Sequence, residues 1–490
     1  MFCYRHQFLK VWCRGKSAAG FSTLEIMIAL AIVVLSVSAV ILVSFGSQFM
    51  GVDAQTNDEA IYKAEAKLEQ VRSLSRSSFA AVRSDGPVPD GMYSLSTEVT
   101  DISPCAKYAT VRVNWQNDIR PLETALHTKL TSPADAHALA GDCAAEPPEA
   151  GWTDPDTLGS ADLVPSGSQA TGLDVVGEYA YVTAVHATAA SPDFFVFDLS
   201  DPADPQLVGS VNTGKGLNAV DVAGSYAFVA HNATNTQLQV IDISNPAAPS
   251  LIASASRTLP GVGASYPEGQ SIYYYDNHVF IGTYETAGNE FHAYDVSNAL
   301  NPQHRGSFSV NHNVHDIVVR GPYAYLALSS TSDSAEELLV LNVNNPSAIT
   351  EVGSYNPPGT HCYATALYAL GTRLFLGMGK MYSQCDAALP DFYVLDISLP
   401  FLPTLLGSAD LDLGNNNFVS GIIVSGNLAF LSLSQQTAGF QVWAVADPTT
   451  PQNLSTLNYA EKAVGLDFEN DYIFTANESN NALRVIYDNP

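Results

Sequence analysis

The amino-acid sequence predicts a mainly β protein. A seven-bladed β-propeller is expected over residues 158–490, after a smaller α+β unit that begins with a long helix. Three observations predict this fold. Two strand-and-turn signatures alternate along the propeller region with a period of about 44 to 54 residues. Each period has room for four short strands, the strand count of a propeller blade. An apolar run followed by an amphipathic run occupies residues 21–78.

Residues 21–78 are expected to form one helix with two unlike halves. The first half, up to residue 45, is apolar and long enough to span a membrane at about 1.5 Å per residue. In the second half the apolar positions recur at spacings of three and four, which indicates one buried face. These positions are Ile61, Ala64, Leu68, Val71 and Leu74. We expect the second half to leave the bilayer and to support a globular head.

That head is expected over residues 79–143. Residues 93–99, 109–115 and 122–130 alternate apolar and polar side chains as half-buried strands do. Trp115, at the end of the second strand, is expected in the core rather than in a contact with a partner. Residues 144–157 are rich in proline and acid, which predicts a stiff linker.

The first signature of the propeller region is a pair of strands joined by a tight turn. Its clearest copy is residues 174–182, Asp-Val-Val-Gly-Glu-Tyr-Ala-Tyr-Val. Further copies, some of them looser, occupy residues 221–229, 272–281, 316–326, 366–376, 422–431 and 466–474. The aromatic positions of these copies fit packing within and between blades.

The second signature is a strand that runs into an Asx-Pro turn. It occupies residues 196–202, 240–246, 293–297, 340–346 and 394–398. Its aspartates recur so evenly that they indicate turn chemistry, in which an Asp side chain accepts a hydrogen bond from the backbone two residues on. Calcium-binding loop patterns of the EF-hand kind are absent from the sequence.

Seven blades can be counted, and the last one lacks a fourth strand. It starts at Ala463 and stops after its third strand at Pro490. Residues 158–164 are similar to the fourth strands at 207–211 and 406–409. We therefore expect residues 158–164 to complete the last blade and close the ring, which removes two free sheet edges.

The start of the chain has a distinctive order of charges. The first 20 residues carry four basic side chains and no acid, and Gly20-Phe21-Ser22-Thr23-Leu24-Glu25 leads directly into the apolar run. This arrangement resembles the processing site of type IV prepilins. The resemblance implies a cleaved leader (residues 1–20), cleavage between Gly20 and Phe21, N-methylation of Phe21, and an apolar segment kept on the mature protein. An ordinary secretory signal is instead cut after its apolar region.

Glu25 is the only ionisable residue from Phe21 to Phe45. An acid inside a membrane-length helix costs a few kcal/mol, so it is usually functional and paired. The resemblance to type IV filaments implies its partner, the N-terminal amine of a neighbouring subunit, and a role for Glu25 in assembly. The alternative is a plain transmembrane anchor whose acid lies near the membrane interface.

Two further resemblances concern the rest of the chain. Residues 111–126 resemble minor pilins of the PilV and pseudopilin-I kind, which implies that residues 21–143 form a pilin-like stem. The repeats resemble the LVIVD-repeat family of β-propellers over about 320 residues.

Charge and cysteine content indicate the compartment. The formal net charge is −28 and the leader contributes only positive charge, so the mature surface lacks the basic footprint that nucleic acid or anionic lipid requires. Cys105 and Cys143 share one segment, and Cys362 and Cys385 share a later one. We expect two disulfides in an oxidising compartment, because the spacings of a metal site are absent.

The loops at the mouth of the propeller channel offer the candidate binding residues. They are Asn218, Glu268, His312, His315 and His361. A ring of such groups could bind a polar ligand or a divalent cation; alternatively, these residues cap strand ends, as Asn and His often do in turns. His315 and Asp316 could also act as an acid–base pair. No catalytic motif is present, so neither enzymatic activity nor a cofactor is expected.

These patterns favour a minor pilin-like protein that displays a propeller outside the cell for adhesion or for priming pilus assembly. Its expected partners are other pilins, the prepilin peptidase and an extracellular ligand. It is expected in the inner membrane before assembly and on the pilus afterwards. Two alternatives stay open: a type II secretion pseudopilin with a substrate-binding propeller, and a membrane-tethered propeller hydrolase.

Overall fold

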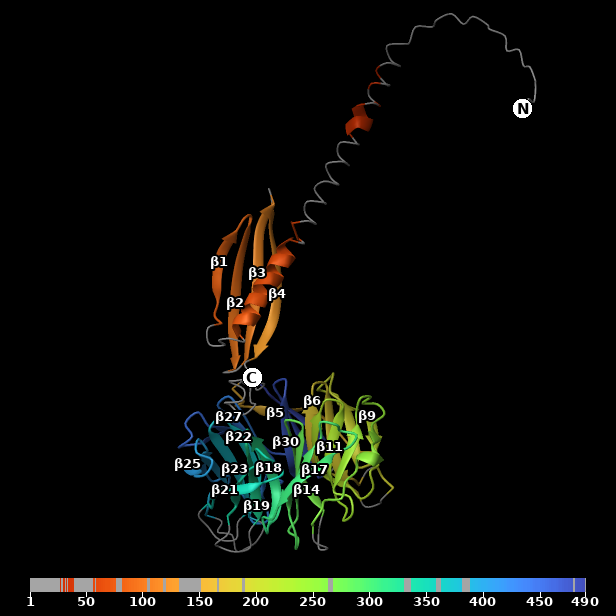
Figure 1. The fold of residues 1–490 in the computed structure, drawn as a ribbon, viewed down its shortest axis with the longest axis vertical. Helices are drawn as coiled ribbons and strands as arrows, with labels where there is room; N and C mark the ends of the chain where they lie inside the picture. Colours follow the sequence, from red (N-terminus) through yellow and green to blue (C-terminus); the bar gives the residue numbers. More distant parts are fainter. Residues whose placement is uncertain are drawn as a thin grey trace, which may run out of the picture. The chain divides into compact units, whose positions relative to one another are not determined.

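The computed structural model contains two compact units, which are described separately here (Figure 1). It describes residues 27, 30, 32, 34–38, 56–57, 59–75, 82–103, 106–117, 120–131, 151–164, 167–186, 190–262, 268–329, 336–357, 363–380, 388–478 and 481–489. Several predicted features lie outside these residues, namely the processing site at Gly20 and Phe21, the acid Glu25, the four cysteines Cys105, Cys143, Cys362 and Cys385, and His361.

The N-terminal unit is a helix packed on a four-stranded sheet. The helix includes residues 59–75. The sheet has the order β1-β2-β3-β4, with bounds Asp85–Asp90, Tyr93–Ser103, Ala106–Asn117 and Arg120–Thr131. Its core joins Ala60, Ala64 and Leu68 of the helix to Tyr93, Val111, Val113 and Trp115 of the sheet. The three predicted strands and the core position of Trp115 are confirmed.

The helix face differs from the prediction at its two ends. Ala64, Leu68 and Val71 are buried as expected, but Leu74 is 41% exposed and Ala60 is fully buried. The packed face therefore begins one residue earlier than the apolar spacing indicates, and at its other end it includes Ser75 rather than Leu74. Over the described parts of the chain, no helix is both long and apolar enough to cross a membrane.

The edge strand β1 was missed by the sequence analysis. Its six residues, Asp-Gly-Pro-Val-Pro-Asp, are all exposed, so they show no alternation of apolar and polar side chains. Two prolines further reduce the signal, although proline is tolerated where an edge strand faces solvent. β1 pairs antiparallel with β2.

The described residues of the second unit form the seven four-stranded antiparallel blades of a propeller (Figure 1). Five blades are separate sheets, and blades 4 and 5 are joined into one eight-stranded sheet by the Ser329–Tyr363 pair. The innermost strands of successive blades lie side by side, and β30 returns to β6 to complete the ring. The blades are blade 1, β6 (Gln169–Val176), β7 (Tyr179–Val185), β8 (Phe194–Asp198) and β9 (Gln206–Val211); blade 2, β10 (Leu217–Ala223), β11 (Tyr226–His231), β12 (Leu238–Asp242) and β13 (Ser250–Leu251); blade 3, β14 (Gly269–Tyr275), β15 (His278–Thr283), β16 (Phe291–Asp295) and β17 (Gln303–Phe308); blade 4, β18 (Asn313–Arg320), β19 (Tyr323–Ser329), β20 (Leu338–Asn342) and β21 (Thr350–Tyr355); blade 5, β22 (Tyr363–Leu370), β23 (Arg373–Gly379), β24 (Phe392–Asp396) and β25 (Thr404–Ala409); blade 6, β26 (Val419–Ser425), β27 (Leu428–Leu433), β28 (Phe440–Ala444) and β29 (Gln452–Leu457); and blade 7, β30 (Ala463–Glu469), β31 (Tyr472–Asn477), β32 (Leu483–Asp488) and β5 (Pro155–Ala161).

The fourth strand of blade 7 comes from the start of the unit. β5 pairs antiparallel with β32, so the predicted closure of the ring is confirmed. The strand begins at Pro155, however, inside the predicted linker 144–157. Trp152 is fully buried, with its ring centroid 4.9 Å from that of Phe430. The end of the expected linker is therefore part of the propeller, because burial of Trp152 fixes it there.

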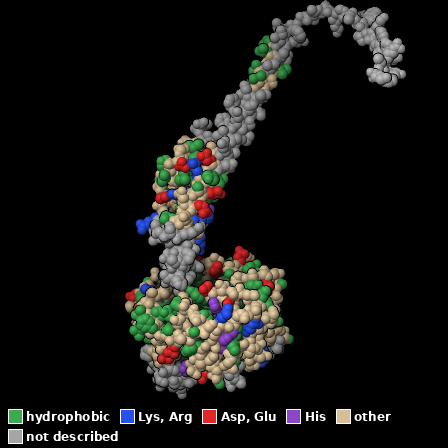
Figure 2. Space-filling view, in the orientation of Figure 1, with side chains coloured by type: hydrophobic (Ala, Val, Ile, Leu, Met, Phe, Trp, Pro, Cys, Tyr) green, Lys and Arg blue, Asp and Glu red, His purple; other side chains and the backbone are tan. Residues whose placement is uncertain are grey.

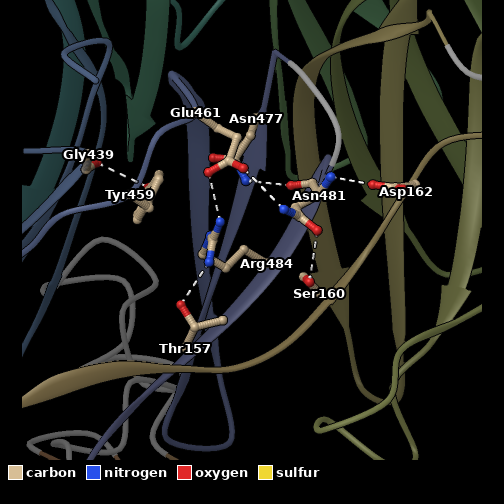
Figure 3. Close-up of polar contacts among 9 residues, drawn as sticks. All are labelled: Thr157, Ser160, Asp162, Gly439, Tyr459, Glu461, Asn477, Asn481 and Arg484. Carbon is tan, nitrogen blue, oxygen red and sulfur yellow. Dashed lines mark hydrogen bonds and ion pairs between the residues drawn. The ribbon is translucent and has the colours of Figure 1, made fainter. Parts of the chain in front are cut away.

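Arg484 of β32 contacts the closing strand β5 through its guanidinium group (Figure 3). Its guanidinium donates to Thr157 Oγ1 of β5 at 2.8 Å and pairs with Glu461 Oε2 at 2.8 Å. It also lies over the Tyr459 ring, 4.5 Å from the centroid. Glu461 and Tyr459 belong to the connection between β29 and β30. One cation thus joins the closing strand to the loop that enters blade 7.

Asn481, just before β32, makes a second set of contacts with the closing segment (Figure 3). Its backbone N–H donates to Asp162 Oδ1, and the Ser160 hydroxyl donates to its Oδ1 at 3.1 Å. Its side-chain amide donates to Glu461 Oε1 at 3.0 Å. The same carboxylate therefore holds both Arg484 and Asn481.

Buried aspartates on the innermost strands tie neighbouring blades together. Each accepts a hydrogen bond from a backbone N–H of the next blade. The pairs are Asp467 with Val175 at 2.7 Å, Asp174 with Val222 at 2.6 Å, Asp221 with Tyr274 at 2.6 Å and Asp316 with Leu367 at 2.7 Å. Burial, opposed by these hydrogen bonds, raises the pKa of Asp174 to about 6 and that of Asp316 to about 7. Burial, with Asp174 as a neighbouring charge, also raises the pKa of Asp221 and Asp467.

The outer turns use the Asx chemistry that the repeats predict. In each, a side-chain oxygen accepts a hydrogen bond of 2.8–3.0 Å from the N–H two residues on. The residues are Asp198, Asp242, Asp295, Asn342 and Asp396. These bonds lower the pKa of the Asp198, Asp242 and Asp396 carboxyls. The predicted Asx turns are confirmed for these residues.

Blade 5 departs from the repeat at its outer turn. Leu399 stands where blades 1–4 and 6 have a second Asx residue, and the chain continues with Phe401 and Leu402. These side chains are 51%, 61% and 58% exposed. Figure 2 shows hydrophobic side chains gathered over this edge of the propeller, beside β25. The turn keeps its backbone bond from Leu402 N–H to Leu399 O, so its shape survives the loss of the Asx side chain.

Replacement of Arg484 by methionine should destabilise the propeller. The Arg484 and Glu461 side chains are only 10% and 13% exposed, and removal of one member of a buried ion pair costs about 3–5 kcal/mol, since the other charge is left unpaired. We expect a lower thermal unfolding midpoint for Arg484→Met. The control is Lys462→Met, whose ammonium is 42% exposed and 3.9 Å from Glu478; it should change stability by no more than about 0.5 kcal/mol. Equal midpoints for the two variants would contradict the role of Arg484.

Acidification from pH 8 to pH 6 should stabilise the wild-type protein relative to Asp316→Asn. The folded pKa of Asp316 is about 7 because of burial, whereas an exposed Asp has a pKa of about 3.9. Between these values the folded state binds a proton that the unfolded state does not, so the cost of the buried charge is lost as the pH falls through 7. The amide of the variant undergoes no such change.

Urea unfolding at pH 8, 7 and 6 measures this difference. Asp201→Asn, in an exposed turn where Asp201 accepts a hydrogen bond from Ala203 N–H, is the control for removal of one carboxylate. Identical pH slopes for wild type and Asp316→Asn would contradict the assignment.

Candidate functional site

Each of the seven innermost strands carries a β-bulge near its start. The register with the second strand shifts there, so that one residue has no partner opposite it. These residues are Thr171, Asn218, Gln270, His315, Thr365, Ser420 and Val464. Bulges re-aim side chains and are common beside functional sites. Here they place seven equivalent side chains around one axis.

The bulge residues line a central cavity of about 700 Å³. Cavities of about 300–1,000 Å³ are the usual size of small-molecule sites. Among the described residues that line it, none is Lys or Arg, and the acids are Asp316 and Glu478. Most other polar groups of the lining are amides and hydroxyls, and Tyr284, Tyr363 and Phe418 add aromatic rings. The cavity is therefore a polar but largely uncharged chamber.

Hydrogen bonds between blades hold much of this ring in place. Several side chains donate to the carbonyl of the residue that precedes the bulge of the next blade. The pairs are Thr171 with Leu217 O at 2.6 Å, Asn218 with Gly269 O at 2.6 Å, Ser271 with Val314 O at 2.9 Å and Thr365 with Val419 O at 2.7 Å. These donors are committed to the ring itself, which makes the wall of the cavity rigid.

His315 differs from those residues. Its imidazole lines the cavity and lies 6.3 Å from the Tyr363 ring, centroid to centroid, but forms no hydrogen bond with the part of the chain that the structure describes. Burial lowers its pKa to about 4. The ring is therefore neutral at pH 7 and presents one donor and one acceptor.

Gln270 and Tyr284 lie on the neighbouring blade 3. Burial raises the pKa of the Tyr284 hydroxyl, and the nearby Gln270 side chain opposes this shift. Gln270 Oε1 is buried and accepts no hydrogen bond within the described residues. A buried polar atom without a partner costs about 1–3 kcal/mol. Tyr284 is 37% exposed, so part of this residue remains accessible from the cavity that it lines.

The predicted mouth residues are only partly brought together. Asn218 and His315 line the cavity, whereas His312 is not among the lining residues. Glu268 precedes β14 and acts electrostatically on Tyr284, and its Oε2 is buried with no hydrogen-bond partner among the described residues. His361 lies outside the described residues.

The considered acid–base pair of His315 and Asp316 is not formed. The Asp316 carboxylate accepts hydrogen bonds from Leu367 N–H and Ile317 N–H, and burial alone accounts for the pKa of His315. The described residues also contain no group of three or more His, Cys, Asp or Glu side chains placed to hold a metal ion.

The sequence analysis missed Thr171, Gln270, Thr365 and Ser420. A signal for some of them was present, because the bulge residue stands three positions before the bridging aspartate in three blades. These segments are Thr171-Gly172-Leu173-Asp174, Asn218-Ala219-Val220-Asp221 and Val464-Gly465-Leu466-Asp467. Blades 3, 5 and 6 lack that aspartate, so this spacing does not identify Gln270, Thr365 and Ser420.

Buried carboxylates before the third strands fix the loops at the mouth. Asp193 accepts hydrogen bonds from Thr213 N–H at 2.7 Å and Gly216 N–H at 3.1 Å. Glu290 accepts one from Val310 N–H at 2.9 Å. Asp391 forms an ion pair with Lys380 at 2.8 Å, and both side chains are almost fully buried. Burial, opposed by Lys380, raises the pKa of Asp391 to about 6. Each acid anchors the connection between two blades.

Comparison with known proteins gives the following similarities. The family described as LVIVD repeat matches residues 167–213, 218–256 and 312–357, which correspond to blades 1, 2 and 4. No curated protein matches the sequence.

Solved structures of similar shape have low sequence identity. BamB from Moraxella catarrhalis is 13% identical, with 68% of this chain and 95% of that chain covered and a TM-score of 0.42. The WD40 β-propeller domain of Doa1 is 11% identical, with 68% and 97% covered and a TM-score of 0.48. Virginiamycin B lyase from Staphylococcus aureus is 10% identical, with 68% and 99% covered and a TM-score of 0.45. The C-terminal unit of this chain is an LVIVD-repeat β-propeller.

Proposed function

We propose that the chain is a minor type IV pilin-like protein that displays its propeller outside the cell as a binding head. The sequence from Gly20 to Glu25, followed by the apolar run, is the observation that carries this proposal. A basic leader, a glycine before the cleavage position and a lone acid at the start of the membrane-length segment occur together there. In a pilin-like protein Phe21 is the methylated N-terminus and Glu25 pairs with a neighbouring subunit.

The N-terminal unit supports the proposal by its architecture. A helix packed on a small sheet, with its own core and separate from the propeller, is what a pilin-like stem requires. Lys63 and Lys67 of the helix bind Asp90 and Asp85 of β1 at 2.7 Å. The sheet edge is thereby held to the helix.

The size of the propeller favours a tip position or a rare one. A head of more than 300 residues on every subunit would crowd a tightly packed filament. Adhesion, or priming of assembly from the tip, requires few copies. The rigid, partly unoccupied hydrogen-bonding wall of the channel supports binding as the task of the head, and the lack of an acid–base pair at His315 favours binding over hydrolysis.

The test is immunogold electron microscopy of intact cells and sheared pili, with antibody against residues 170–490. Gold at filament tips is expected. Mass spectrometry of the sheared material should find Phe21 as the methylated N-terminus. Label confined to the cell envelope and absent from sheared filaments would contradict the pilus role and favour a secretion pseudopilin or a tethered enzyme.

Glu25→Ala should abolish surface display while the propeller stays folded, because the N-terminal amine of the neighbouring subunit loses its partner. Glu65→Ala is the matched control, since Glu65 is an exposed acid on the solvent-side helix. Display is measured by whole-cell immunofluorescence, and folding by protease resistance of the propeller. Equal display of both variants would contradict the role of Glu25.

A further inference from the structure

One sector of the channel wall has unused hydrogen-bonding capacity. The His315 imidazole reaches the cavity with neither nitrogen engaged by a described residue, and Gln270 keeps an oxygen without a donor. They occupy equivalent bulge positions on adjacent blades. The two groups therefore project from neighbouring strands at the same level of the ring, while Thr171, Asn218 and Thr365 donate to the ring itself.

A partly exposed aromatic residue lies in the same sector. Tyr284 lines the cavity, with the Gln270 side chain near its hydroxyl. The Asn313 side chain, also in the lining, accepts a hydrogen bond from Glu285 N–H at 2.7 Å, so the segment that carries Tyr284 is tied to blade 4. A partly exposed ring next to amide and imidazole groups binds molecules that have both C–H faces and hydroxyl edges.

The charges around the cavity select against anionic ligands. An anion would meet no Lys or Arg among the described lining residues and would approach Asp316, Glu478 and a strongly acidic protein. A metal ion would find no ligand cluster among the described residues. The groups that line the cavity therefore favour a neutral ligand with many groups that both donate and accept hydrogen bonds.

We propose that the channel mouth binds a short uncharged oligosaccharide, with Gln270 and His315 as its hydrogen-bonding residues and Tyr284 as its stacking surface. Sugar hydroxyls both donate and accept hydrogen bonds, so they satisfy both nitrogens of a neutral imidazole and can bond the Gln270 side chain where it lines the cavity. The cavity accommodates a ligand of this size. The inference rests on the proposed role of the propeller as a binding head and names the class of its ligand.

The test uses the full chain, purified in a detergent without a sugar headgroup, on an array of glycans. The array contains neutral oligosaccharides of glucose, galactose, mannose and N-acetylhexosamines beside sialylated and uronate-containing ones. Binding to neutral members is expected, with little dependence on salt. Titration calorimetry on the best neutral oligosaccharide should show at least a tenfold weaker affinity for His315→Phe and for Gln270→Leu.

The matched control is His278→Phe, the same substitution at the β14–β15 turn of blade 3, where His278 bonds Asp276 O; it should bind as wild type does. His315→Gln, which keeps a donor and an acceptor, should recover part of the affinity that His315→Phe loses. Thermal unfolding verifies that each variant is folded. Absence of neutral-glycan binding, a preference for the acidic glycans, or equal affinity of His315→Phe and His278→Phe would overturn the proposal.

This experiment and the immunogold test fail independently. Gold at pilus tips without glycan binding would overturn the ligand class alone. Glycan binding by a protein that is absent from filaments would overturn the pilus role alone.

Discussion

The pairing of β5 with β32 is the constraint on which the propeller depends. Antiparallel sheets leave an unpaired edge on their outermost strands, and the ring requires its first and last blades to meet. Here the meeting occurs within one blade, where Pro155–Ala161 supplies the strand that β30, β31 and β32 lack. Arg484 and Asn481 reinforce the same seam through Glu461. Without this seam, the contact between β30 and β6 would lose its support.

Polar groups, not apolar ones alone, set the geometry of the ring. Apolar clusters span each pair of neighbouring blades, but apolar contact is non-directional and fixes no exact register. The bridging aspartates and the bulge side chains do so, because each is directed at one backbone group of the next blade. The raised pKa of Asp316 reflects the free-energy cost of burying a carboxylate that holds one strand of the next blade. These hydrogen bonds between blades make the channel wall rigid.

The sequence repeat made most of the propeller predictable. Residues that do not follow the repeat could not be assigned a role from the sequence. Turn aspartates such as Asp242 recur with the blades, so their role followed from spacing. Gln270 and Thr365 carry no such mark, since a bulge is a property of pairing rather than of composition. Strand β1 lacked alternation because all its side chains face solvent. The end of the linker was misplaced because the residues that bury Trp152, such as Phe430, lie almost 300 positions later in the sequence.

The position of Trp152 has a mechanical consequence. The chain that precedes the propeller joins it at Trp152 and continues directly into the closing strand β5. Any tension along that chain is therefore applied to the seam of the ring, not to a peripheral loop. Trp152 is buried against blade 6 and its backbone N–H donates to Asp488 Oδ2, so tension reaches this residue before it reaches β5. A pull on the preceding chain must therefore first extract the buried Trp152 side chain before it can separate β5 from β32 and open the ring.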